Sequence, residues 1–427
     1  MPRLRVIVAC LLLATAGGGV LASRLSDTPV VETTVVGLGP GTTAVDERTG
    51  RVFVVNTQDR TVSLLDSRSG RLVRTITVGF YPELVAVDAP SGHAFVATDE
   101  GLVSMLDGQT GSVLQSVRVG TDVADLAVDA QTGRVFGADP DDGTVSLLDA
   151  RSGAVLANVA VSGDPQHVAV DAQTGRVFVA SDGATGGYIT VLDARSGAVI
   201  STLQVGPSPR PWVQQRIGRV LVYDRAGRVA VLDARSGRLL RTVSLRADMY
   251  AGAVDERTGR VIMAAAPLGT EPSTICRGAG RLVVLDARSA AVVKSVAVAA
   301  RPCLLAVNPL TGHLLAVTLG ATADDGTVRD AGSLSVFDAD SLAPHGTLTV
   351  GLSPGGLALD ARSGRAFVTN SNVNPDGSAT GATAPESGVV QVQRWLRHTL
   401  PWLPLPDPPP PTPILQGTVT VLDAAQL

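Results

Sequence analysis

Short apolar runs separated by polar turns recur along the chain at a spacing of about 40 residues. Residues 134–139 and 144–149 are two such runs, and each ends at an Asp or is followed by Gly within a few positions. Runs of this length, bounded by Gly, Asp and Ser, are typical of β-strands. Because long helical spacings are nearly absent, the pattern predicts an all-β chain built from one repeated four-stranded unit.

The repeat aligns as eight units. An Asp closes the third run of each unit, at Asp66, Asp107, Asp149, Asp193, Asp233, Asp286, Asp338 and Asp423. A second Asp closes the first run of six units, with Asn308 in the seventh unit and Gln215 in the fifth. A four-stranded unit of this length is typical of a propeller blade. We therefore expect a single closed β-propeller of eight blades over residues 23–427, with seven blades as the alternative.

The sequence Asp-x-x-Ser/Thr-Gly follows both the first and the third run, as at Asp129–Gly133 and Asp149–Gly153. A ligand site would not need the same residues at two different places of the unit. A tight turn does need them, because Asp accepts backbone N–H groups and Gly adopts a positive φ. We interpret the motif as a structural turn.

The two ends of the repeat are complementary. Residues 30–36 have the pattern of a fourth strand without a blade, and the last unit stops after its third strand at residues 417–423. Pairing of these segments would complete the last blade and remove two exposed sheet edges. We expect the N-terminal strand to close the ring in this way.

Four second strands carry a more specific signature. They are Phe53-Val54-Val55-Asn56, Phe95-Val96-Ala97-Thr98, Phe178-Val179-Ala180-Ser181 and Phe367-Val368-Thr369-Asn370. These segments resemble the Tyr-Val-Thr-Asn signature of the bacterial YVTN-repeat, or YncE-like, propellers, and the resemblance covers residues 30–427. It implies an exported or surface propeller with nucleic-acid or cell-envelope partners in some relatives. Many relatives have seven blades, so the eighth unit is a departure.

The N-terminus has the pattern of an export signal. Arg3 and Arg5 precede an apolar segment, and a small-residue cleavage site ends at Ala22. We expect residues 1–22 to be a signal peptide, with an uncleaved membrane anchor as the alternative, and an extracytoplasmic protein in both cases. Because the net charge is −4, the sequence carries no strong signal for a nucleic-acid partner, and we expect a monomer that contacts a protein or the cell envelope.

Candidate binding residues lie where each unit departs from the repeat. Two adjacent positions, five and four residues before the end of the first strand, vary while their neighbours stay Ala, Val and Asp. We expect them to ring the mouth of the central channel, as a ligand site or as a solvated lining without a ligand. These candidates are Glu83, Asp125, Gln166, His167, Arg210 and Tyr250.

The expected function is a binding scaffold without a cofactor or a metal, rather than an enzyme. No covalent haem motif, zinc set or nucleophile elbow is present in the sequence. The alternative is a channel-centred hydrolase of the lactonase type, in which Glu83 and Asp125 would contribute to a calcium site, or a redox propeller.

Two further features break the repeat. Cys276 and Cys303 would both emerge on the variable face, and we expect them to form a disulfide in an oxidising compartment, contributing roughly 3 kcal/mol, with two free thiols as the alternative. Residues 371–416 are an insertion between the second and third strands of the last blade. Its helical spacing and its Trp395, Leu396 and Trp402 predict a partner or membrane contact, with packing on the propeller itself as the alternative.

Overall fold

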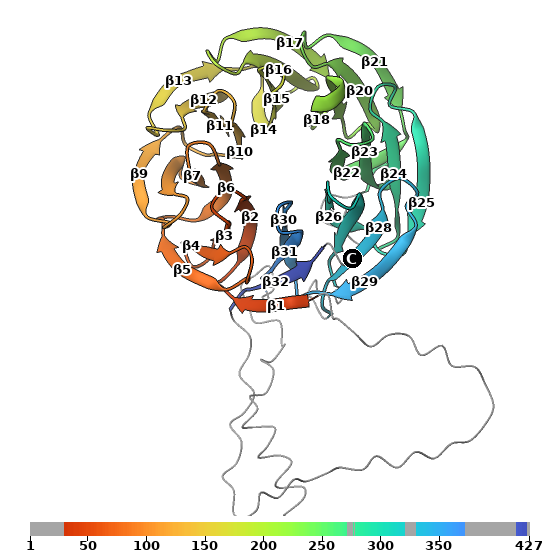
Figure 1. The fold of residues 1–427 in the computed structure, drawn as a ribbon. Helices are drawn as coiled ribbons and strands as arrows, with labels where there is room; N and C mark the ends of the chain where they lie inside the picture. Colours follow the sequence, from red (N-terminus) through yellow and green to blue (C-terminus); the bar gives the residue numbers. More distant parts are fainter. Residues whose placement is uncertain (1–29, 271–275, 277, 321–329, 372–415, 425–427) are drawn as a thin grey trace, which may run out of the picture.

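The computed structural model describes residues 30–270, 276, 278–320, 330–371 and 416–424. Eight four-stranded antiparallel sheets are arranged as blades around one axis (Figure 1). This is the eight-bladed propeller that the repeat predicts, and the seven-bladed alternative is wrong. The described residues contain no helix with the length and the apolar character that a membrane span requires.

The first four blades follow one another without interruption, and each runs from the innermost to the outermost strand. The first blade contains β2 (Pro40–Asp46), β3 (Arg51–Asn56), β4 (Thr61–Asp66) and β5 (Leu72–Thr77). The second contains β6 (Pro82–Asp88), β7 (His93–Thr98), β8 (Leu102–Asp107) and β9 (Val113–Arg118). The third contains β10 (Asp125–Asp129), β11 (Arg134–Asp139), β12 (Thr144–Asp149) and β13 (Val155–Ala160). The fourth contains β14 (Asp164–Asp171), β15 (Arg176–Asp182), β16 (Gly187–Asp193) and β17 (Val199–Val205).

The other four blades complete the ring. The fifth contains β18 (Arg210–Gln214), the 3-10 helix η1 (Gln215–Ile217), β19 (Arg219–Tyr223), β20 (Arg228–Asp233) and β21 (Leu239–Ser244). The sixth contains β22 (Ala247–Asp255), β23 (Arg260–Pro267), β24 (Gly280–Asp286) and β25 (Val292–Val298). The seventh contains β26 (Pro302–Val307), β27 (His313–Thr318), β28 (Ser333–Asp338) and β29 (Pro344–Thr349). The eighth contains β30 (Pro354–Asp360), β31 (Arg365–Asn370), β32 (Thr418–Asp423) and, outermost, β1 (Val30–Val35).

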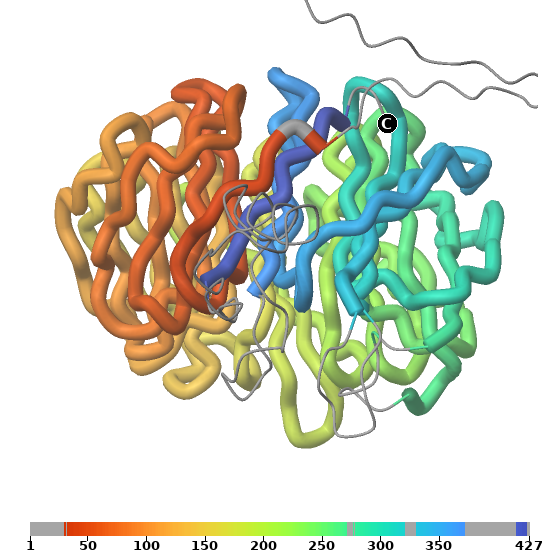
Figure 2. The backbone as a smooth tube through the Cα atoms, turned by 90° about the horizontal axis from the view of Figure 1, so that it is seen from below, coloured from red at the N-terminus to blue at the C-terminus, as the bar shows by residue number. Residues whose placement is uncertain are grey.

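The eighth blade joins the two ends of the repeat. Strand β1 pairs antiparallel with β32, and Val35 lies opposite Thr418. Just beyond the pair, the Val36 N–H donates to the Gly417 carbonyl at 2.9 Å. Figure 2 shows β1, in red, beside the dark blue β32. The predicted closure of the ring by the N-terminal strand is confirmed.

The hydrophobic core lies between neighbouring blades. Phe95 of β7, for example, packs in one buried cluster with Val135 and Leu148 of the third blade. Phe occupies the same position of the second strand in five blades, and each ring is fully buried: Phe53, Phe95, Phe136, Phe178 and Phe367. Because each blade covers the apolar face of the next one, no blade buries its core alone.

The repeated Asp-x-x-Ser-Gly segments are turns. In the third blade, Asp149 Oδ1 accepts hydrogen bonds from the Arg151 N–H at 3.1 Å, the Ser152 N–H at 2.9 Å and the Ser152 hydroxyl at 3.0 Å. Gly153 follows with a φ of 68°, which side chains disfavour. The structural interpretation of the motif is confirmed. We call the side of the ring that carries these turns the turn face, and the opposite side, where the innermost strands begin, the entry face.

The fifth blade departs from the predicted alignment by one residue. Gln214 lies opposite Arg219, as Asp129 lies opposite Arg134 in the third blade, so Gln214 and not Gln215 replaces the buried Asp. Gln214 is 0% exposed, and its side-chain amide donates to the Asp255 carbonyl of the sixth blade at 2.9 Å. Two consecutive Gln residues left the position ambiguous in the sequence, and the strand register resolves it.

Candidate functional site

The innermost strands are irregular where they begin on the entry face. Six of them carry a β-bulge near their first residue. A bulge places one extra residue in a strand and redirects its side chain, and bulges are frequent beside functional sites. The single extra residues are Glu83, Gln166, Tyr250, Cys303 and Gly355. The first variable column of the sequence therefore coincides with the bulges of six of the eight blades, whereas β10 and β18 carry none.

The next variable column pairs regularly with the second strand. Asp125 lies opposite Ala138, and His167 lies opposite Ala180. Arg210 lies opposite Tyr223 at the same place of the fifth blade. Arg210 therefore shares the column of Asp125 and His167, one position from where the sequence alignment put it.

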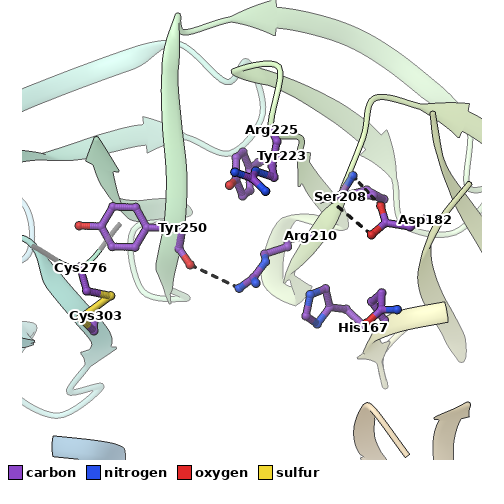
Figure 3. A pocket seen from close by; sticks show the side chains of 11 residues that line it. His167, Asp182, Ser208, Arg210, Tyr223, Arg225, Tyr250, Cys276 and Cys303 are labelled. Carbon is purple, nitrogen blue, oxygen red and sulfur yellow. Dashed lines mark hydrogen bonds between the residues drawn. A yellow bond between two sulfur atoms is a disulfide. The ribbon is translucent and has the colours of Figure 1, made fainter. Parts of the chain in front are cut away.

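Four of the six candidates meet in one pocket of about 470 Å³, which we call the inner-strand pocket (Figure 3). Pockets of this volume accommodate small molecules or a few residues of a partner. The candidates that line it are Gln166, His167, Arg210 and Tyr250, and the other lining residues are Asp182, Ser208, Pro209, Tyr223, Arg225, Cys276 and Cys303. The fourth to seventh blades thus contribute to one site.

Arg210 lies at the centre of this pocket, between the Tyr250 carbonyl and the His167 ring (Figure 3). Its Nη1 donates to the Tyr250 carbonyl at 3.4 Å. Asp182, the only carboxylate that the described residues contribute to the lining, accepts from the Ser208 N–H at 2.7 Å and the Ser208 hydroxyl at 3.5 Å. The pocket therefore combines a cationic centre with a carboxylate that is already held by hydrogen bonds.

Two tyrosines form the apolar part of the wall. Tyr223 is 3% exposed, and burial raises its pKa to about 12. Trp212 packs on it with ring centroids 5.6 Å apart. Tyr250 is 9% exposed, burial raises its pKa, and its hydroxyl has no hydrogen-bond partner among the described residues. The Tyr250 ring points away from Arg210, so this residue presents mainly its backbone to the centre of the pocket (Figure 3).

Glu83 and Asp125, the remaining candidates, do not line the inner-strand pocket. The Asp125 carboxylate accepts from the Leu126 N–H at 2.8 Å and from the Val168 N–H at 2.9 Å. Its Oδ2 lies 3.8 Å from the His167 Nδ1. Asp125 thus links the third blade to the fourth by a hydrogen bond and lies close to the His167 ring.

Glu83 belongs to an acidic group of the second and third blades. Burial, together with the negative charges of Asp99 and Asp122, raises the pKa of Glu83. Burial, followed by the charges of Asp141, Asp139 and Asp99, raises the pKa of Asp122. Within the described residues, no three His, Cys, Asp or Glu side chains are grouped so as to hold a metal ion.

A disulfide joins Cys276 to Cys303, whose Cα atoms are 5.3 Å apart, and both residues line the inner-strand pocket. The bond links the sixth blade to the bulge of β26 in the seventh blade. Trp395, Leu396 and Trp402 of the insertion lie outside the described residues, as does the N-terminal segment 1–22.

Sequence reasoning did not include Tyr223, Arg225, Asp182 or Ser208. They belong to the ends of second strands or to connecting segments, and not to the two variable columns. An Ala lies opposite Asp125 in the third blade and opposite His167 in the fourth, but Tyr223 takes its place in the fifth. This change from Ala to Tyr is visible in the sequence and could have indicated the site. No spacing in the sequence indicated that Arg225 lies beside Tyr223 at this pocket.

A family model matches the chain over residues 58–211 and 141–384, and it describes the outer membrane protein assembly factor BamB. No curated protein sequence matches the chain. BamB from Moraxella catarrhalis has a similar structure, at 15% identity and a TM-score of 0.56, with 80% of this chain and 97% of that chain covered.

Two other solved structures share the fold. Sqt1 from Saccharomyces cerevisiae is 13% identical with a TM-score of 0.61, covering 79% of this chain and 94% of that chain. The dihydro-heme d1 dehydrogenase NirN in complex with DHE is 15% identical with a TM-score of 0.59, covering 76% of this chain and 69% of that chain. At these identities the likeness shows the fold alone.

Proposed function

Because the chain belongs to the family of the outer membrane protein assembly factor BamB, we propose that it is a non-catalytic scaffold of the cell envelope. In this proposal the propeller binds a partner or a ligand through the inner-strand pocket. The observation that carries the proposal is the convergence of Gln166, His167 and Arg210 from two adjacent blades on that pocket.

A closed ring suits a scaffold. Strand pairing ties β1 to β32, and buried apolar clusters join neighbouring blades, so the entry face is held in one shape. The turn face carries nearly the same Asp-x-x-Ser/Thr-Gly turn in every blade, whereas side-chain variety is concentrated at the inner-strand pocket. Variation on a rigid frame favours recognition at the entry face.

The alternative is a channel-centred hydrolase or redox propeller. The calcium version of it depends on Glu83 and Asp125, and these two carboxylates lie outside the inner-strand pocket. Asp125 already accepts two backbone N–H groups. The pocket itself contains cationic and amide donors, which are groups that recognise a ligand. These observations support the scaffold.

We assign the protein to the extracytoplasmic space. The family description and the export-signal pattern of residues 1–22 support this location. Mass spectrometry of protein purified from its own cells should give a mature chain beginning at Ser23. A chain that keeps residues 1–22 would favour the anchored form, and one recovered only from the cytoplasm would contradict the location.

We also propose that the chain is related to the YVTN-repeat propellers. The four segments that resemble the signature form corresponding second strands, β3, β7, β15 and β31. Their Phe residues are fully buried between blades. A sequence profile built from the YVTN repeats should align with these strands in register, and an alignment shifted by one residue would contradict the relationship.

Site-specific photo-cross-linking tests the scaffold proposal. A photoreactive amino acid replaces Gln166 in the inner-strand pocket, and the matched control replaces Gln173 on the turn face. In intact cells, position 166 should give a discrete adduct that a His167→Trp substitution in the same pocket would block, whereas position 173 should give none. Adducts from position 173 alone, or from neither position, would refute binding through the pocket.

A further inference from the structure

We propose that the inner-strand pocket recognises a carboxylate group, presented by a small molecule or by a peptide, through Arg210 and Arg225. This inference rests on the proposed function, because it names the chemistry that the same site accepts. It follows from the balance of charges and donors in the pocket, from the shape of the arginine side chain and from the acidic group across the entry face.

Arg210 and Arg225 differ from the arginines of the turn face. On that face Arg134 Nη1 lies 2.6 Å from Asp149 Oδ2, and Arg176 Nη1 lies 3.0 Å from Asp193 Oδ2. Among the described residues, no ion pair involves Arg210 or Arg225. These two turn-face arginines each pair with a carboxylate of their own blade, whereas Arg210 and Arg225 have no ion-pair partner among the described residues.

Arg210 and Arg225 line the same pocket as the Tyr223 ring. The charges of Arg210 and Arg225 oppose the effect of burial on the pKa of Tyr223, and those of Asp248 and Asp224 add to it. Figure 3 shows Arg225 beside Tyr223, with Arg210 nearer to the centre of the pocket. Two cationic forks beside one aromatic wall can bind a planar anion by paired hydrogen bonds.

The rest of the lining offers more donors than acceptors. Gln166 and His167 make no side-chain hydrogen bond among the described residues, although the Asp125 carboxylate lies 3.8 Å from His167 Nδ1. Asp182, the one acid among the described residues of the lining, already accepts two hydrogen bonds from Ser208. A ligand that supplies acceptor oxygens would therefore accept hydrogen bonds from Gln166 and Arg225, whose side chains donate to no other described residue.

The acidic group limits how much negative charge a ligand can carry. Glu83, Asp99 and Asp122 lie in the second and third blades, and their mutual repulsion raises the pKa of Glu83 after the larger effect of burial. A polyphosphate or a nucleic acid would extend its charges toward this group and be repelled. A ligand with one or two carboxylates bound near the fifth blade would avoid this repulsion. The geometry therefore favours a carboxylate over a polyanion.

Isothermal titration of the full mature chain tests the proposal with four probes. Glutarate represents a free carboxylate, and acetyl-Gly-Gly-Glu represents a peptide carboxylate. Its neutral counterpart acetyl-Gly-Gly-Gln amide and inorganic phosphate are the comparison probes. We expect one or both carboxylates to bind at least tenfold more tightly than the amide and phosphate, and the tighter one identifies the source of the group.

Arg210→Gln and Arg225→Gln should each weaken carboxylate binding at least tenfold. The matched control Arg195→Gln removes the same charge from the turn face, where Arg195 is exposed, and should change the affinity less than twofold. Arg210→Lys keeps the charge without the planar fork and should lose part of the affinity. Melting temperatures establish that each variant is folded.

The outcomes separate this inference from the proposed function. Equal affinity for the acid and the amide, tighter binding of phosphate, or an equal loss in Arg195→Gln would overturn the carboxylate assignment. The assignment would also be overturned if neither of the two carboxylate probes bound. If the photoreactive residue at position 166 still forms its adduct in cells, the scaffold proposal holds even though the carboxylate assignment is wrong. If the adduct is absent as well, both proposals fall.

Discussion

Asn308 of the seventh blade donates a hydrogen bond from Nδ2 to the backbone carbonyl of Ala424 in the eighth blade, at 3.2 Å. Its Oδ1 also accepts from the Leu310 N–H at 2.9 Å, so the same side chain orders its own turn. Asn308 is 2% exposed. Six other blades have Asp at this position, which cannot donate to a carbonyl when ionised. Gln214 of the fifth blade is the other exception, and Asn308 is the one that lies next to the blade that closes the ring.

Replacing Asn308 by Asp removes the donor and keeps the acceptor of the turn. We expect a loss of about 1–3 kcal/mol in unfolding free energy, because a buried carboxylate would face the Ala424 carbonyl. Denaturant unfolding measures the loss, and Asn308→Ala, which removes both interactions, should lose at least as much. Wild-type stability in Asn308→Asp would show that this contact does not hold the closing blades together.

The turn aspartates should behave as structural groups. Asp193 Oδ1 accepts from the Ser196 N–H at 3.0 Å and the Ser196 hydroxyl at 2.9 Å, while Oδ2 pairs with Arg176. Asp193→Ala should therefore destabilise the protein by about 1–2 kcal/mol, and Asp193→Asn should cost less because it keeps an acceptor. Arg195→Ala in the same turn is the control and should be neutral. Equal melting temperatures for wild type and Asp193→Ala would contradict the assignment.

The same turns predict acid sensitivity. Backbone N–H donors at Ser152 and Ser196, supported by the hydroxyls of the same residues, lower the pKa values of Asp149 and Asp193. A lowered folded pKa means that these groups contribute stability above the unfolded value of about 3.9 and lose it as the pH falls through the folded value. Melting temperature should fall steeply below about pH 4, and less steeply in Asp193→Asn. A curve that is flat down to pH 2 would exclude this contribution.

Glu83 should show the opposite dependence. Burial, Asp99 and Asp122 raise its pKa, so the folded protein disfavours the charged form. Its contribution to stability therefore decreases as the pH rises from the unfolded value of about 4.3 through the raised folded value. Glu83→Gln should raise the melting temperature at pH 7, and the gain should disappear at pH 3. Glu100→Gln, in a loop of the same blade, is the control. A lower melting temperature in Glu83→Gln at pH 7 would contradict this account.

The insertion should be separable from the ring. Asn370 of β31 lies opposite Thr418 of β32, so the two strand ends that flank the insertion are already adjacent. Replacing residues 372–415 by a short Gly/Ser linker should change the melting temperature by less than about 3 °C. Deletion of residues 30–35 removes β1 and should cause a much larger loss. Insoluble protein after the first change alone would place the insertion in the core.

The fold was predictable because its signals are local. Each blade carries its own turn Asp and its own buried second strand, such as Asp149 and Phe136, and eight copies reinforce one alignment. Only the fifth blade was misaligned, because Gln214 and Gln215 are chemically equivalent in the pattern and the register separates them.

The site was predictable only in part. Gln166 and His167 stood out because they occupy two variable columns beside uniform Ala, Val and Asp columns, and the structure brings them to the same pocket as Arg210. The placement of Arg225 beside Tyr223 depends on the path of one connecting segment, which no periodicity encodes. The burial of the Tyr250 ring depends on the packing of the sixth blade against the seventh, which is equally invisible in a single repeat.

The pairing of β1 with β32 also sets the order of events during biosynthesis. Strand β1 leaves the ribosome among the first described residues, and its partner leaves among the last. At ordinary translation rates the wait lasts roughly tens of seconds, during which β1 is an unpaired edge. A truncated chain that lacks β32 would retain seven sets of blade strands but no means of closing them. The ring can therefore close only once the chain extends through β32, which pairs with both β1 and β31.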